Sequence, residues 1–311
     1  MHRISVVVPV YNEEGNVKEL HREIKEVCDK NNYEYEIIFI DDGSGDKTRE
    51  LCMELKPLKY IRMRRNSGQT AAMDAGIKVA QYDYIVTMDG DRQNDPADIP
   101  AMIDYLVEHD YDVVSGWRKN RKDTFMKRFV SRGANMLRYL LVHDGIHDSG
   151  CSLKVYRKEC FKGINLYGEQ HRFIPAILKI KGFTVGEVVV HHRPRTAGRT
   201  KYNWKRTFKG FVDMISVWFW NKYATRPLHL LGGMGMFCLG IGGGCGIWSI
   251  ILFLMGRKMS NNIFPPLLTI FFITIGMLLF VFGLMSEILI KIYFGVQVDK
   301  SYSIKEIIEN E

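Results

Sequence analysis

The sequence lacks several features that would assign it to a common protein class. Its six cysteines in 311 residues have neither metal-ligand spacing nor the density of a disulfide framework, which favours a reducing, cytoplasm-facing main domain. No zinc-finger, homeodomain or RNA-binding signature accompanies the net charge of +8, so nucleic acid is not an expected partner. The first apolar run, at residues 4–10, is too short for a signal peptide, and Glu13 and Glu14 follow it closely.

The first 115 residues alternate strand-like and helix-like segments, yet they lack the glycine fingerprint of a dinucleotide-binding fold. Residues 4–10 are continuously apolar, which is typical of a parallel strand buried on both faces. Further strands are expected at residues 35–40, 60–63, 84–88 and 112–115, with helices at 16–30, 47–55 and 70–80. This alternation predicts a doubly wound, Rossmann-like α/β sheet. No G-x-G-x-x-G follows the first run, so a dinucleotide-dependent dehydrogenase is not expected.

Charge is absent from two stretches near the C-terminal end of the chain. Neither residues 228–254 nor residues 263–286 contain Asp, Glu, Lys or Arg. Each stretch is longer than the ~20 residues that a helix needs to cross a ~30 Å hydrocarbon core. A pair of buried core helices is the alternative, but the length and the missing charge favour transmembrane helices at about 228–254 and 263–290.

Basic and aromatic residues precede these apolar stretches. Residues 125–141 form one expected basic amphipathic helix, and residues 203–220 repeat the pattern with aromatic residues at helical steps. Such helices commonly lie in the membrane interface, and packing onto the sheet is the alternative. The basic clusters at residues 118–138 and 193–209 therefore favour an anionic membrane and phosphate groups as partners.

Two carboxylates, one residue apart, follow the expected strand at residues 84–88. Asp89 and Asp91 leave the strand at its end, where both can converge on one cation from the edge of the sheet. A hard divalent ion with oxygen ligands suits such a pair, and such an ion usually also holds substrate phosphates. An Asp-rich turn is the alternative, because Asp-Gly is a common turn dipeptide.

Eight short segments between residues 4 and 210 carry a family resemblance. They are residues 8–14 (VPVYNEE), 40–44 (IDDGS), 65–69 (RNSGQ), 88–96 (MDGDRQNDP), 114–118 (VSGWR), 148–153 (DSGCSL), 171–175 (HRFIP) and 198–202 (GRTKY). In this order they resemble family 2 glycosyltransferases of the GT-A fold, the nucleotide-diphospho-sugar transferase fold. More narrowly, the chain resembles polyprenyl-phosphate glycosyltransferases, the group of bactoprenol glucosyltransferase and dolichol-phosphate mannose synthase. The two C-terminal helices match the bactoprenol branch.

The resemblance implies a metal site and a nucleotide-sugar pocket. Asp89, Asp91 and Gln93 would bind Mg²⁺ or Mn²⁺, which would stabilise the leaving diphosphate, and this makes Asp91 catalytic. The residues expected in the pocket are Pro9, Tyr11, Glu13, Asp41, Asp42, Gly68, Gln69, Asp89, Gly90, Arg199 and Lys201.

Three of these expectations carry a more specific role. Asp41 or Asp42 would receive the nucleobase or the ribose. Arg199 and Lys201 would belong to a mobile loop that closes over the diphosphate. Glu13 would line the nucleotide pocket, although an acid at this position can instead be one that a helix N-terminus favours.

The acceptor phosphate implied by the resemblance needs cations more than a base, because the second pKa of a phosphomonoester is about 6. Arg118, Arg121 and Arg132 are expected to bind it, since guanidinium groups grip phosphate oxygens bidentately. Solvated or headgroup-facing charge is the alternative for each arginine. Arg118 and Asp148 are also expected to be catalytic. Asp148 is expected to orient the acceptor phosphate or the sugar, or else to cap a helix.

The resemblance further implies inverting transfer of a hexose from a nucleotide-diphosphate sugar to a polyprenyl phosphate such as undecaprenyl phosphate. UDP-glucose is the first choice of donor, and the product would serve cell-envelope glycosylation. There are two alternative enzymes: one that transfers mannose from GDP-mannose to the lipid, and a membrane-anchored transferase with a non-lipid acceptor. An alternative from another class is a non-catalytic membrane scaffold that binds a nucleotide sugar. A processive polysaccharide synthase is less favoured, because the sequence has neither Gln-x-x-Arg-Trp nor further spans.

Four segments follow from these expectations. They are a GT-A catalytic domain at residues 1–202, a juxtamembrane amphipathic helix at 203–226, two transmembrane helices within 227–291 and a tail at 292–311. Basic residues are denser outside the loop between the spans, which places the catalytic domain and both termini in the cytoplasm of a multi-pass inner-membrane protein. Eight glycines in the first span allow close helix approach and predict a homo-oligomer.

Overall fold

The computed structural model describes most of the first 194 residues and both long C-terminal helices. The described residues are 2–119, 145–166, 168, 170–194, 219, 223, 227–257 and 263–296. The chain forms two compact units that meet in the sequence near residue 218. Several predictions lie outside the described residues: Arg121, Arg132, Arg199, Lys201, the helix at 125–141 and most of the helix at 203–226.

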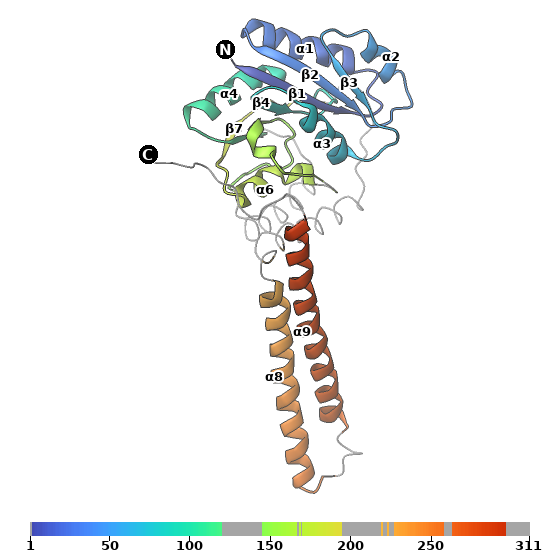
Figure 1. Cartoon of the computed structure of the whole chain (residues 1–311), viewed down its shortest axis with the longest axis vertical. Helices are drawn as coiled ribbons and strands as arrows, with labels where there is room; N and C mark the ends of the chain where they lie inside the picture. Colours follow the sequence, from blue (N-terminus) through green and yellow to red (C-terminus); the bar gives the residue numbers. More distant parts are fainter. Residues whose placement is uncertain are drawn as a thin grey trace. The chain divides into compact units, whose positions relative to one another are not determined.

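A seven-stranded mixed sheet forms the centre of the first unit (Figure 1). In chain order its strands are β1 (Arg3–Val10), β2 (Glu34–Asp41), β3 (Lys59–Arg62), β4 (Tyr84–Thr87), β5 (Val113–Trp117), β6 (Lys154–Arg157) and β7 (Val185–Val189). Their order in space is β3-β2-β1-β4-β6-β5-β7. The first four strands are parallel to one another, whereas β6 runs antiparallel to both β4 and β5.

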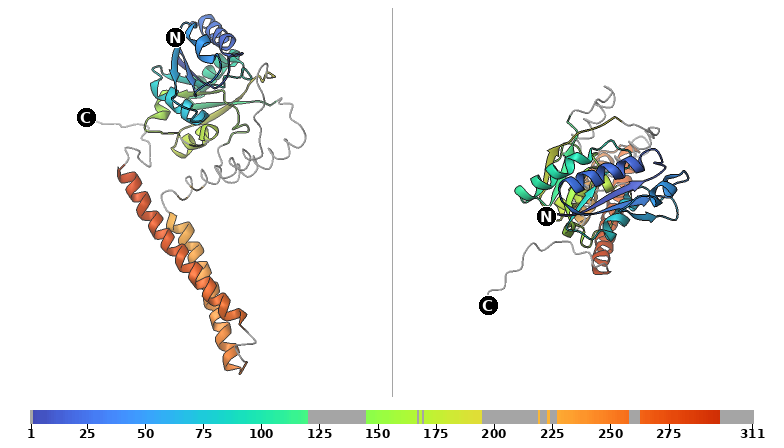
Figure 2. Two further views of the ribbon diagram at one scale, coloured as in Figure 1. Left: turned by 90° about the vertical axis from the view of Figure 1, so that its right-hand side faces the viewer. Right: turned by 90° about the horizontal axis from the view of Figure 1, so that it is seen from above.

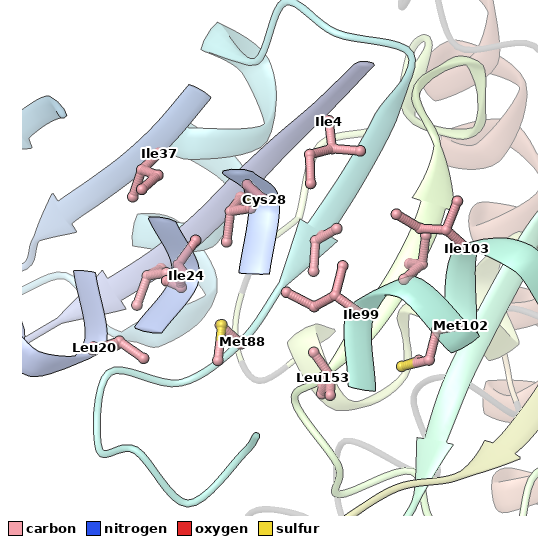
Figure 3. Packing of buried hydrophobic residues seen from close by; sticks show 14 of the residues in the cluster. Ile4, Leu20, Ile24, Cys28, Ile37, Met88, Ile99, Met102, Ile103 and Leu153 are labelled. Carbon is pink, nitrogen blue, oxygen red and sulfur yellow. The ribbon is translucent and has the colours of Figure 1, made fainter. Parts of the chain in front are cut away.

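Helices cover both faces of the sheet, as the apolar strands predict. On one face α1 (Val17–Lys30) and α4 (Ile99–Glu108) pack on a core that includes Val6 and Val8 (Figure 3). On the other face α3 (Gln69–Val79) and α6 (Ile174–Ile180) pack on a core that includes Val7. Successive residues of β1 thus point into opposite cores. The predicted α/β class and the strands through β5 are confirmed.

Several elements were not predicted from the sequence. They are α4, α6, β6, β7 and three short 3₁₀ helices, namely η1 (Pro96–Asp98), η2 (Lys158–Phe161) and η3 (Gln170–Arg172). The helix α2 (Thr48–Met53) is shorter than the expected 47–55. The four-residue strand β6 interrupts the parallel order, because it enters the sheet from the long connection after β5 and pairs with β4 in the opposite direction.

The second unit contains α8 (Pro227–Leu254) and α9 (Phe264–Val296), which lie side by side (Figures 1 and 2). Both are long and apolar enough to cross a membrane, and only 11% of the most apolar part of each is buried. This exposure is consistent with the predicted transmembrane spans and not with buried core helices. The helices approach closely at Gly235 and Gly276, where a Cβ on Gly235 would lie 2.7 Å from the Gly276 carbonyl oxygen.

Candidate functional site

The carboxyl ends of β1, β2 and β4 meet at one edge of the sheet. The pairing of Val10 with Asp41 and of Val7 with Thr87 aligns the three strand ends. This edge therefore gathers predicted site residues from three separate parts of the chain, as expected for a parallel sheet. Gly90 lies close against β1, since a Cβ there would be 3.2 Å from the Pro9 carbonyl oxygen.

The two acids at the end of β2, its last residue Asp41 and the next residue Asp42, are hydrogen-bonded through all four carboxylate oxygens. Asp41 is 0% exposed, and it accepts hydrogen bonds from the Ser44 backbone N–H at 2.7 Å and the Tyr60 hydroxyl at 2.5 Å. Asp42, also buried, accepts from the backbone N–H groups of Ser67 at 2.7 Å and Gly68 at 2.9 Å. These carboxylates hold the loops at the edge of the sheet. Direct contact with a nucleoside stays a prediction.

The two acids after β4 have a different environment. Asp89 accepts a hydrogen bond from Gln69 Nε2 at 2.6 Å and another from the Ser152 side chain, and Asp91 accepts from the Gln93 backbone N–H at 3.1 Å. Burial raises the pKa of Asp89, and the charge of Asp91 raises it further. Two carboxylates that repel each other in a poorly solvated place fit a divalent cation.

Such a cation would have coordination positions open to a ligand. Within the described ranges, no group of three or more His, Cys, Asp or Glu side chains is arranged to hold a metal ion. Asp89 and Asp91 would therefore share the ion with oxygen atoms from elsewhere. The side-chain amide of Gln93 is half-buried two residues after Asp91 and stays a predicted ligand.

Glu13 and Tyr11 lie just beyond β1 at the same edge. The Glu13 carboxylate accepts a hydrogen bond from Asn16 Nδ2 at 2.6 Å, and Asn16 is the residue that precedes α1. Glu13 therefore has the local role expected of an acid near a helix N-terminus. Its contact with a nucleotide stays a prediction. An open hollow of about 690 Å³ lies over residues 12–16 and 45–46.

A second pocket, of about 90 Å³, lies beside Asp89. The residues that give it polar character are Gln69, Asp89, Ser152, Lys154, His171 and Arg172. Lys154 is 2% exposed, and burial lowers the pKa of its amine to about 8. Ring nitrogen Nδ1 of His171 lies 2.7 Å from the Thr70 hydroxyl, which fixes the imidazole against α3.

Sequence reasoning missed the basic members of this pocket as site residues. His171 and Arg172 belong to a segment that carried the resemblance, but they received no role. Lys154 gave no local signal, because it is the first residue of β6, whose four residues, K-V-Y-R, are charged at both ends. A buried lysine is rare unless it faces other charged groups, and only the fold shows that Lys154 is buried.

Arg118 and Asp148, both predicted to be catalytic, form a forked ion pair. Arg118 Nε donates to Asp148 Oδ2 at 2.7 Å, and one terminal nitrogen donates to Oδ1 at 3.0 Å. Their side chains are only 11% and 18% exposed. Burial alone would raise the pKa of Asp148, but the hydrogen bonds and charge of Arg118 lower it. Asp148 caps no helix in the described part of the chain; it orients Arg118.

Comparison with known families and proteins matches nearly the whole chain. The model of the family described as Glycosyl transferase family 2 matches residues 5–164. Dodecaprenyl-phosphate galacturonate synthase from Rhizobium johnstonii is 35% identical over 322 residues, which cover 99% of this chain and 94% of that protein. Undecaprenyl-phosphate 4-deoxy-4-formamido-L-arabinose transferase from Aeromonas hydrophila subsp. hydrophila is 32% identical over 318 residues, with the same two coverages.

Solved structures share the fold of the first unit. Glucosyl-3-phosphoglycerate synthase from Mycobacterium tuberculosis, in complex with Mn²⁺, UDP and glucosyl-3-phosphoglycerate, has a TM-score of 0.56 at 16% identity. The match covers 71% of this chain and 80% of that one. Mannosyl-3-phosphoglycerate synthase from Rubrobacter xylanophilus has a TM-score of 0.58 at 16% identity, covering 70% and 74%. The predicted GT-A fold is confirmed.

Proposed function

The chain belongs to glycosyltransferase family 2, and from this premise we propose that it transfers a sugar from a nucleotide-diphosphate sugar to a polyprenyl phosphate. One observation carries the proposal. The two relatives align with 99% of the chain, the helix pair included, and the names of both contain a polyprenyl phosphate. A helix pair suited to a membrane would keep such an enzyme beside its lipid acceptor.

A divalent cation, Mg²⁺ or Mn²⁺, fits the acids after β4. Asp89 and Asp91 would hold it, with Gln93 as a third candidate ligand. When bound, the ion supplies positive charge that stabilises the leaving diphosphate. The complex of the Mycobacterium tuberculosis relative with Mn²⁺ and UDP supports this assignment. Gln69, which donates to Asp89, would keep that carboxylate turned toward the site.

The acceptor phosphate would meet arginine side chains. Arg118 is suited to bind it, because Asp148 holds the guanidinium in a fixed orientation and the second terminal nitrogen, Nη1, is not part of their fork. Arg121 and Arg132 are proposed as further acceptor contacts. A phosphomonoester is already largely ionised near neutral pH, so these residues would position the nucleophile rather than deprotonate it. Direct attack would invert the anomeric centre.

The donor nucleotide would bind over the carboxyl ends of β1 and β2. Pro9, Tyr11 and Glu13 would line its site, with Asp42 holding Gly68 beside it. Arg199 and Lys201 are proposed to close over the diphosphate. The acids after β2 would act chiefly by shaping the loops, since their oxygens are already hydrogen-bonded.

Three donor sugars follow from different observations. UDP-glucose is the first donor to test, because the two-span architecture resembles bactoprenol glucosyltransferases. The names of the relatives add a galacturonate and a formamido-arabinose donor. The buried Lys154 and the neighbouring Arg172 favour a polar or anionic sugar substituent over an apolar one. We further propose a multi-pass inner-membrane location with a cytoplasmic catalytic domain, and a homo-oligomer.

The test is transfer of radiolabelled sugar from a panel of UDP- and GDP-sugars to undecaprenyl phosphate. The full chain in detergent would be assayed with Mg²⁺ or Mn²⁺, with a water-soluble acceptor and no lipid in a parallel arm. Label in the organic phase from one donor would support the proposal and identify the sugar. Label only on the water-soluble acceptor would overturn the lipid acceptor and indicate a membrane-anchored transferase. Nucleotide binding without transfer to either acceptor would indicate a non-catalytic scaffold.

A further inference from the structure

Glu23 on α1 joins two arginines that are far apart in the sequence. A terminal nitrogen of Arg92 donates to Glu23 Oε1 at 2.6 Å, and a terminal nitrogen of Arg193 donates to Oε2 at 2.9 Å. The Glu23 side chain is 15% exposed, so it is largely removed from solvent. Each carboxylate oxygen therefore binds one guanidinium group, in a place where charged hydrogen bonds are strong.

Arg92 lies inside the metal loop, which we define as residues 89–95. It stands between Asp91 and Gln93 with φ +59°, a left-handed conformation that residues other than glycine rarely adopt. Its buried Nε has no hydrogen-bond partner among the described residues. The Arg92 guanidinium is held by Glu23, and the same terminal nitrogen lies 3.9 Å from Glu19 Oε1. This contact opposes relaxation of a strained turn next to a proposed metal ligand.

Arg193 holds the other end of the same loop. Its backbone N–H donates to the Gln93 carbonyl oxygen at 2.9 Å, and its guanidinium contacts both oxygens of Asp95, at 2.7 and 3.1 Å. The preceding residue, His192, forms a β-bridge with Asn94. The metal loop is therefore attached along its second half to the segment after β7, and Arg193 in turn is attached to Glu23.

We propose that Glu23 is a positioning residue for the metal and diphosphate site. It binds neither; it acts through Arg92 and Arg193, which fix the metal loop so that Asp89 and Asp91 stay converged. The inference rests on the proposed function. A merely stabilising ion pair is the competing explanation, and α1 offers a direct comparison, because Glu26 pairs with Arg22 within the same helix, at 2.5 Å.

Glu23→Gln in the full chain tests the role, with Glu26→Gln as the matched control. Mn²⁺ binding is measured by electron paramagnetic resonance in the presence of UDP, which does not require turnover. We expect Glu23→Gln to weaken Mn²⁺ binding about 10-fold or more, as loss of a group that orients metal ligands commonly does. The apparent KM for Mn²⁺ should rise while kcat at saturating Mn²⁺ is largely retained. Glu26→Gln should bind Mn²⁺ like the wild type.

Two further variants keep the inference falsifiable if Glu23→Gln does not fold. Arg193→Gln should weaken Mn²⁺ binding in the same way. Arg92→Gly should also weaken it, although glycine accepts the left-handed conformation, because the contact with Glu23 is lost. Wild-type Mn²⁺ binding in folded Glu23→Gln, or in both other variants, would overturn the positioning role alone. Failure of the wild type to bind Mn²⁺ with UDP would overturn the proposed metal site and this inference together.

Discussion

Two pairs of aspartates end strands on either side of β1, and their surroundings are opposite. Asp41 and Asp42, at the end of β2, have hydrogen-bond donors on every carboxylate oxygen. Asp89 and Asp91, after β4, lie close enough for the charge of one to raise the pKa of the other. The same residue type at the same edge of one sheet thus supports loops in the first pair and forms the proposed metal site in the second.

The difference follows from what each strand end faces. The loop after β2 turns back on itself and meets the chain at Ser67 and Gly68, whose N–H groups are otherwise unpaired at the start of α3. The loop after β4 meets side chains, including Gln69 and the pocket with Lys154. The first pair is therefore held by a donor on every carboxylate oxygen, whereas Asp89 lies among side-chain groups, Gln69 and Ser152 among them, where we propose a metal ion.

The largest expected effect comes from removing a charge of the second pair. Asp91→Asn should lower kcat/KM for sugar transfer at least 10³-fold, about 4 kcal/mol of transition-state stabilisation, because metal binding is lost. Initial rates of organic-phase labelling measure it. Asp83→Asn, at an exposed acid paired with Arg3, is the control and should leave the rate unchanged. Loss of less than 10-fold in Asp91→Asn would remove Asp91 from the metal site.

Removing a member of the first pair should instead cost stability. Asp42→Ala leaves the N–H groups of Ser67 and Gly68 without their acceptor, at about 2–3 kcal/mol for the two together. Thermal unfolding of the first unit, followed by tryptophan fluorescence, should show a lowered Tm. Asp29→Ala, at an exposed acid of α1, should show a much smaller change. An unchanged Tm for Asp42→Ala would contradict the supporting role.

A smaller effect is expected from the glycine that Asp42 holds. Gly68 has φ +94° and ψ 156°, a conformation that is strained for any residue with a Cβ, although nothing lies within 4 Å of where a Cβ would be. Gly68→Ala should cost about 1–2 kcal/mol from this strain alone. Gly45→Ala, which is equally open but has no positive φ, should be nearly neutral in the same Tm measurement.

The smallest expected effect is on the pH dependence of stability at Asp89. The pKa of Asp89 is raised in the folded protein, so its contribution favours the folded state at low pH and is lost as pH rises through the folded pKa. In EDTA, Asp89→Asn should therefore have a Tm equal to or above that of the wild type at pH 7. The difference should shrink toward pH 4. Added Mn²⁺ should stabilise the wild type and not the variant.

Much of the parallel half of the sheet could be predicted from the sequence, because its strands alternate along the chain with helical segments. The strand β6, K-V-Y-R, is as polar as β3, K-Y-I-R, but it stands outside this alternation. Its partners β5 and β4 lie some 40 and 70 residues earlier in the chain. The helix α4 had a readable signal in Ile99, Met102, Ile103 and Leu106, which are buried at helical spacing.

The candidate site divides in the same way. Asp89 and Asp91 could be predicted because their spacing is local and follows a strand. Lys154 and Arg172 could not be assigned to the pocket beside Asp89 from the sequence. They lie on β6 and η3, which reach this pocket only in the folded chain. The contacts of Glu23, with partners 69 and 170 residues away, leave no periodic or local trace in the sequence.

The sequence by itself determined the alternation of strands and helices, the two long charge-free stretches and the acids near the strand ends. Each of these depends on neighbouring residues, whose spacing decides which face they share. Only the tertiary structure decided which hydrogen-bond donors and charges each pair of acids meets. That outcome depends on distant segments, because burial makes a carboxylate costly unless folding brings a hydrogen-bond donor or an opposite charge to it.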